Sequence, residues 1–352
     1  AFRHTYRNLY DNKNWDLTPN RENDIHSDVT IVPDYLFRDL NLKYTFRNEQ
    51  DFHIQFSLLA GQDKFSYNVD EMLTTRYQLL RNTKEKSLQK GASLLIGKDG
   101  KNGVSTQFSM SYSSLDARFE NEQEVVNTFN DNIRKNINQQ TLNSIREASV
   151  KLKSAWAVNN NHQLESALSW VGNGSSWNED SSGVDVIDQR IRGSHLTLMA
   201  QDRMTFDKLK LVPGIRITRV PYLEKSFLEP RISSSYSFNK ALNLNLSAGL
   251  YRQFLTKNSV EDEYGNYRYM WTVANDTKHP FLRSKHLTAS LTLEKGNTQA
   301  SLSPYYRSTN GLTRYVNFKI RNIETIYTGH SRSYGVDLYL KQNFMGHTAW
   351  IS

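Results

Sequence analysis

The stretch Glu229–Phe254, EPRISSSYSFNKALNLNLSAGLYRQF, decides the fold, because two runs of alternating residues flank a short turn at 239–241. The apolar positions of the two runs, each set on a single face, are Ile232, Tyr236 and Phe238, then Leu242, Leu244, Leu246, Ala248 and Leu250. Successive side chains of a strand point to opposite faces, so the pattern predicts a β-hairpin with one apolar and one polar face. Each arm has about ten residues, which is the length of a tilted strand that crosses the hydrocarbon core of a bilayer.

Similar hairpins recur along the rest of the chain. Their predicted turns lie at 48–51, 97–103, 159–162, 207–208, 295–297 and 342–346. Between the hairpins lie polar connections, most of them long, at about 61–86, 116–146, 173–192, 255–284 and 310–330. Short periplasmic turns that alternate with long extracellular loops are typical of outer-membrane barrels. The sequence therefore predicts an all-β fold, an antiparallel transmembrane β-barrel, and favours it over a soluble sandwich or a propeller, for which no repeated blade motif is visible.

One connection has a different period. Within 116–146, apolar residues recur at three- and four-residue spacing at Val126, Phe129, Ile133 and Ile137. Asn121 and Glu124 also have the spacing of a capping box. This spacing predicts a short amphipathic helix inside the connection.

Composition excludes several classes of protein. The chain has 352 residues, no cysteine and a net charge of +8 without clustered basic residues, so neither a disulfide scaffold nor nucleic-acid binding is expected. It has no run of 18 apolar residues, which argues against a helical membrane protein. The nine histidines show no metal-binding spacing. No catalytic triad or phosphate-binding glycine loop is present, so we expect no enzyme, no metal site and no cofactor.

Four segments in the second half resemble strands of one known family. They are LKLVPGIR at 209–216, LEPRIS at 228–233, LYRQF at 250–254, and SYGVDL at 333–338 followed by WIS at 350–352. In this order and at this spacing they resemble the barrel domain of TonB-dependent outer-membrane receptors. The resemblance covers roughly residues 200–352, and the first 200 residues support it through their pattern alone.

The resemblance implies part of a 22-stranded barrel in the outer membrane of a Gram-negative bacterium. It also implies a plug domain and energy from the TonB complex, whereas the chain shows fourteen predicted strands and no plug-like segment. We therefore expect residues 1–352 to be a partial barrel domain, with the plug domain absent from this chain and the last strands lacking. The implied partners are the TonB complex, through the missing plug, and outer-membrane lipid and lipopolysaccharide. A surface lipoprotein is a further candidate partner.

The function that the resemblance implies is TonB-dependent import of a nutrient ligand, such as a siderophore, a glycan or a peptide. Two alternatives stay open: a passive or structural outer-membrane barrel, and a soluble all-β carbohydrate-binding module. Candidate ligand-binding residues in the connection 255–284 are Tyr264, Tyr267, Arg268, Tyr269 and Trp271. Aromatic rings there can stack on a ligand and the guanidinium can pair with an anion, although the alternating rings could also simply extend a strand above the membrane. The predicted lipid-facing residues are Ile232, Tyr236, Phe238, Leu242, Leu244 and Leu246.

Overall fold

The computed structural model describes residues 29–100, 103–261, 267–318 and 323–352. The described chain is all-β apart from one 3-10 turn, η1 (Pro221–Leu223). Within these ranges no helix is long and apolar enough to cross a membrane. The strands of the first half are β1 (Val29–Arg47), β2 (Phe52–Thr74), β3 (Tyr77–Asp99), β4 (Val104–Asn127), β5 (Ile133–Ala157), β6 (His162–Ser181), β7 (Val184–Phe206) and β8 (Leu209–Val220). Those of the second half are β9 (Lys225–Ser237), β10 (Leu242–Gln253), β11 (Leu255–Glu261), β12 (Tyr267–Val273), β13 (Leu282–Lys295), β14 (Thr298–Phe318), β15 (Ile323–Phe344) and β16 (His347–Ile351).

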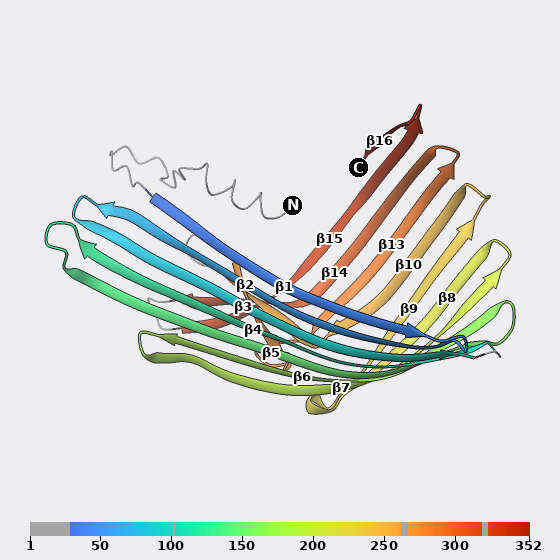
Figure 1. Ribbon diagram of the computed structural model, residues 1–352, viewed down its shortest axis with the longest axis horizontal. Helices are drawn as coiled ribbons and strands as arrows, with labels where there is room; N and C mark the ends of the chain where they lie inside the picture. Colours follow the sequence, from blue (N-terminus) through green and yellow to red (C-terminus); the bar gives the residue numbers. More distant parts are fainter. Residues whose placement is uncertain (1–28, 101–102, 262–266, 319–322) are drawn as a thin grey trace.

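These strands form one curved sheet (Figure 1). Consecutive strands pair antiparallel from β1 to β10, and the order then continues through β13, β14, β15 and β16. The hairpin β11–β12 leaves this path and joins β14 by a short parallel pairing of 258–260 with 313–315. In the described residues β1 pairs only with β2 and β16 only with β15, so the sheet is open.

The seven predicted turns are confirmed and lie along a single edge of the sheet, on the right in Figure 1. Asn48, Asn159 and Asn239 each begin a turn, and their Oδ1 atoms accept hydrogen bonds from backbone amides two and three or four residues later. Such local bonds stabilise a turn without help from the rest of the fold. Neighbouring turns are also linked, since the amide of Ser237 donates to the carbonyl of Lys208 at 2.9 Å.

The register assembles the predicted alternation into one apolar face and one polar face. Residues directly opposite each other on neighbouring strands share a face. One row of such partners is Tyr44, Phe56, Leu94, Met110, Val150, Trp170 and Leu196. Another row is Tyr236, Leu244, Leu291, Leu302 and Leu338. We call this continuous surface from β1 to β15 the apolar band. The other face carries polar residues such as Lys151 and Asn243.

The six predicted lipid-facing residues lie together at the β9–β10 part of this band. Ile232 faces Ala248 and Tyr236 faces Leu244 across β9 and β10. Leu242, Leu244 and Leu246 face Leu293, Leu291 and Ala289 of β13. Phe238 follows directly on β9, and its ring contacts that of Tyr236 in an edge-on arrangement.

The helix predicted within 116–146 is wrong. β4 continues to Asn127, a turn follows, and β5 begins at Ile133, so the apolar residues with helical spacing flank a turn instead. The connections 61–86, 116–146 and 173–192 are likewise mostly strand, with tight turns near Arg76, Asp131 and Gly183. Around 120–124 both faces are polar, and the alternation that reveals a strand is lost there. Over 64–70 alternation persists, but its apolar residues Phe65, Tyr67 and Val69 lie on the face opposite the apolar band. Within the connection 255–284 the structure adds two strands, β11 and β12, to the fourteen predicted.

Candidate functional site

The hairpin β11–β12 lies against the polar face of the sheet, where β12 contacts β5, β6 and β7. This is the connection that holds the predicted ligand-binding residues. Tyr267, Arg268, Tyr269 and Trp271 belong to β12, whereas Tyr264 lies outside the described residues. One interpretation of the sequence was that these residues extend a barrel strand above the membrane. In the structure β12 instead lies across the polar face of the sheet.

One side-chain amide of the sheet fixes the backbone of β12. Asn143 of β5 donates from Nδ2 to the carbonyl oxygen of Trp271 at 2.8 Å. Its Oδ1 accepts from the amide of the same residue at 2.7 Å. The Asn143 side chain is thus bonded to both backbone polar groups of Trp271, and it is itself almost fully buried. This pair of bonds reproduces the pairing that a neighbouring strand would supply.

Further contacts fix the next residues of β12. The Oγ of Ser175 accepts from the amide of Val273 at 3.0 Å. Met270 packs on Trp177, the largest fully buried side chain of the described chain. One side of the hairpin packs against the sheet. Its buried residues are Met270 and Thr272 of β12 and Asn258 of β11, which pairs with Met270.

The base of the hairpin is held by a buried carboxylate. Glu229 of β9 is fully buried. Its Oε1 accepts from the backbone amide of Arg252 at 2.7 Å, and its Oε2 accepts from the hydroxyl of Thr218 at 2.9 Å. The guanidinium Nε of Arg216 lies 3.6 Å from Oε2 and compensates the negative charge. Glu229 belongs to the E-P-R motif, which indicated a family resemblance but no structural role in the sequence analysis.

The segment that follows β12 contains a buried histidine that is uncharged. His279 is fully buried; its Nε2 lies 3.0 Å from Gln189 Oε1 and its Nδ1 lies 3.4 Å from Asn258 Nδ2. Gln189 Oε1 accepts a hydrogen bond and Asn258 Nδ2 donates one. These partners fit the His279 tautomer that is protonated at Nε2. Burial, together with the charge of Lys278, lowers the pKa of His279 to about 4. The ring is therefore uncharged at neutral pH, as this pair of bonds requires.

The opposite side of the hairpin combines aromatic rings with a positive charge. Tyr269 and Trp271 alternate with the buried Met270, and Tyr269 is 46% exposed. The Nζ of Lys257, on the paired strand β11, lies 3.2 Å from the centroid of the Tyr269 ring and 5.9 Å from that of Trp271. We call Lys257, Tyr269 and Trp271 the aromatic–lysine face. Sequence reasoning missed Lys257, because only the register of β11 with β12 brings it beside these rings.

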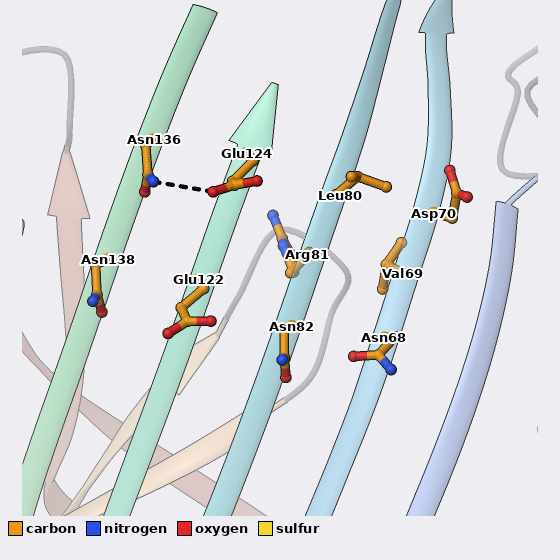
Figure 2. Close-up of a pocket in the computed structure, with 10 residues that line it drawn as sticks. All are labelled: Asn68, Val69, Asp70, Leu80, Arg81, Asn82, Glu122, Glu124, Asn136 and Asn138. Atoms are coloured by element: carbon orange, nitrogen blue, oxygen red, sulfur yellow. Dashed lines mark hydrogen bonds between the residues drawn. The ribbon is translucent and has the colours of Figure 1, made fainter. Parts of the chain in front are cut away.

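A separate hollow of about 700 Å³ lies on the other side of the sheet, beyond the apolar band. Figure 2 shows that its polar side chains come from the neighbouring strands β2 to β5 and that Asn136 donates to Glu124, at 3.1 Å. Other residues of the lining are Asn68, Asp70, Asn82, Glu122 and Asn138. In the part of the chain that the structure describes, no group of three or more His, Asp or Glu side chains could hold a metal ion.

Comparison with known proteins identifies the family. The family described as TonB dependent receptor-like, beta-barrel, matches residues 2–351. No curated protein matches the sequence significantly. Among solved structures, the copper transporter OprC has a TM-score of 0.53 at 12% identity, covering 94% of this chain and 60% of that one. The RagAB peptide transporter has a TM-score of 0.51 at 9% identity, covering 89% and 49%.

The outer membrane transporter YddB from Escherichia coli has a TM-score of 0.50 at 11% identity, covering 88% of this chain and 52% of that chain. At these identities the likeness concerns the fold, and this chain spans about half to three fifths of those proteins. These relatives are receptors and transporters rather than enzymes. The family match over nearly the whole sequence and the open antiparallel sheet agree, and the chain therefore belongs to the TonB-dependent receptor β-barrel family.

Proposed function

We propose that the chain is the barrel part of a receptor that imports a nutrient ligand across the outer membrane of a Gram-negative bacterium. The TonB complex would supply energy through a plug domain. Family membership supports the receptor class and the outer-membrane location. The observation that carries the transport proposal is the hairpin β11–β12, bound to the polar face through Asn143 and Ser175. Side chains of a hairpin held there would lie in the path of a ligand through the barrel.

The aromatic–lysine face of this hairpin is the proposed ligand contact. Exposed aromatic rings offer stacking surface to a sugar, a siderophore ring or a peptide side chain, and the ammonium of Lys257 offers a partner to an anionic group. Tyr264, Tyr267 and Arg268 belong to the same connection and are proposed as further ligand-binding residues. A surface lipoprotein and lipopolysaccharide remain proposed partners.

Trp271→Ala in the full-length receptor should lower uptake about 2- to 10-fold, because an aromatic contact contributes about 0.5–1.5 kcal/mol beyond the area it buries. The measurement is growth of cells that depend on this receptor for a ferric siderophore, a glycan or a peptide mixture as the limiting nutrient. Trp170→Ala removes an indole from the apolar band and should leave uptake unchanged when the amount of receptor is matched.

Two outcomes would contradict the proposal. Uptake that persists unchanged without TonB, together with steady conductance of the full-length protein in a planar bilayer, favours the passive barrel. Normal uptake by the Trp271→Ala variant, with TonB still required, rejects the aromatic–lysine face as the contact and leaves active import standing.

The proposed lipid contact of the six β9–β10 residues has its own test. Leu244 lies directly opposite Tyr236 of β9 and Leu291 of β13. Leu244→Arg should destabilise the full-length barrel in lipid by about 2–4 kcal/mol if the residue lies near the bilayer midplane. Asn245→Arg, one residue along and on the polar face, is the matched control. Equal denaturant midpoints for both variants in vesicles would show that Leu244 does not face lipid.

A further inference from the structure

Basic residues follow the outer border of the apolar band on the same face of the sheet. The register row next to the band runs through Leu40, Ala60, Lys90, Ser114, Arg146, Gly174 and Arg192. The basic residues of this row are Lys90, Arg146 and Arg192. They lie on alternate strands, and the strands between them carry the small residues Ser114 and Gly174. Since strands lie about 4.8 Å apart, neighbouring cations of this row are roughly 10 Å apart along the sheet.

The next two rows outward are mainly positive but contain one acid each. One row contains Arg38, Asp116 and Arg190, and the other contains Lys64, Lys86, Arg118 and Asp188. Lys64 lies directly opposite Lys86, which lies directly opposite Arg118. Like charges at directly opposite positions destabilise a sheet, so this arrangement is unfavourable unless anions lie nearby.

The chain itself neutralises only part of this charge. Arg118 pairs with Glu120, and Arg190 lies 3.9 Å from Asp188. Lys90, Arg146 and Arg192 are exposed, and none of them has an ion-pair partner in the described ranges. We call these three residues the basic row.

Two features place the basic row at a membrane border. On its inner side the ring of Tyr112 lies in the adjacent row, at the position where barrels carry an interfacial aromatic girdle, and Trp170 lies one row further in. Trp170 lies over the bare backbone of Gly172, because a Cβ at that glycine would meet its ring at 2.7 Å. On the outer side, acidic residues of the same face begin with Asp116, one row beyond the basic row, and continue with Glu122 and Glu124 at the hollow of Figure 2. An anion is thus favoured in a narrow zone directly beside the apolar band.

We propose that the basic row binds the phosphate groups of lipids in the leaflet that surrounds this edge of the barrel. Arginine forms paired hydrogen bonds with phosphate, and basic residues beside a membrane attract anionic headgroups. The small residues Ser114 and Gly174 leave space between the cations for a headgroup. The lipid chains would then continue along the apolar band. This inference rests on the proposed membrane placement of the barrel.

The test compares two triple variants of the full-length receptor in phosphatidylcholine nanodiscs. Lys90→Gln, Arg146→Gln and Arg192→Gln remove the basic row. Lys208→Gln, Lys240→Gln and Lys295→Gln remove the same charge from exposed positions at the hairpin turns of the opposite edge. The probe is diphosphoryl lipid A, and its dephosphorylated form is the second arm.

Loss of the basic row should weaken binding of diphosphoryl lipid A at least 10-fold, since each basic residue near an anionic surface contributes about a factor of five. The turn variant should bind as the wild type does, and the dephosphorylated lipid should bind weakly to all three proteins. Equal binding of the phosphorylated lipid by the two variants would overturn the inference. If TonB-dependent uptake persists in that case, the proposed function survives; a full-length protein recovered without detergent would reject both.

Discussion

Replacing Glu229 by alanine should destabilise the full-length barrel by about 3–5 kcal/mol, because it leaves the positive charge of Arg216 without its buried partner. The same substitution removes the acceptor of the Arg252 amide and of the Thr218 hydroxyl. Glu229→Gln keeps an acceptor at this position and loses the charge, so its effect should be smaller. The measurement is the denaturant midpoint in lipid vesicles, followed by tryptophan fluorescence.

Glu294→Ala is the control for this effect. Glu294 is an exposed carboxylate near a hairpin turn, and its removal should change the free energy of unfolding by less than about 0.5 kcal/mol. A Glu229→Ala variant as stable as the control would show that the buried carboxylate does not hold β8, β9 and the end of β10 together.

Asn143→Ala should release β12 from the sheet. The substitution leaves the amide and the carbonyl group of Trp271 without partners, and each buried polar group left unpaired costs about 1–3 kcal/mol. We expect a total of about 2–4 kcal/mol for opening of the hairpin. Amide hydrogen exchange of 269–274, measured by mass spectrometry, should therefore accelerate about 30-fold or more.

Asn138→Ala is the matched control, since Asn138 lies on the same strand with an exposed side chain. Exchange at the hairpin should be unchanged in this variant. If Asn143→Ala also leaves exchange unchanged, the hairpin is held by Ser175 and the Met270–Trp177 contact without the amide. A faster exchange combined with lost uptake would connect the docked hairpin to transport.

The sequence predicted the parts of the fold that arise from neighbouring residues. Alternation over Leu242–Leu250 predicted both the strand and its apolar face, and the asparagines at 48, 159 and 239 marked turns whose bonds are local. Beyond the apolar band the same reasoning failed. Around Glu122 and Glu124 both faces of the strand are polar. The sequence there shows no hydrophobic alternation, and apolar residues happen to recur at helical spacing. Pairing of this segment with β3 and β5 makes it a strand.

The candidate site was predicted only in part. The cluster Tyr267–Trp271 was located by its density of aromatic residues, but the side of the hairpin that packs on the sheet could not be read from it. Asn143 and Trp271 are 128 residues apart in the chain, and nothing in either neighbourhood indicates their contact. Lys257 joins the aromatic rings only through the register of β11 and β12.

The sequence by itself determined that this protein is a sheet of amphipathic hairpins with the seven predicted turns at one edge, because alternation and turn chemistry act over a few residues. The tertiary structure alone decided that β11–β12 folds onto the polar face and that the basic row forms beside the apolar band. Both depend on residues brought together by strand register, which accumulates over the whole sheet. The hairpin Glu229–Phe254 joins the two levels. Its alternation is local, whereas the burial of Glu229 requires Arg216 and Thr218 of β8 and Arg252 of β10.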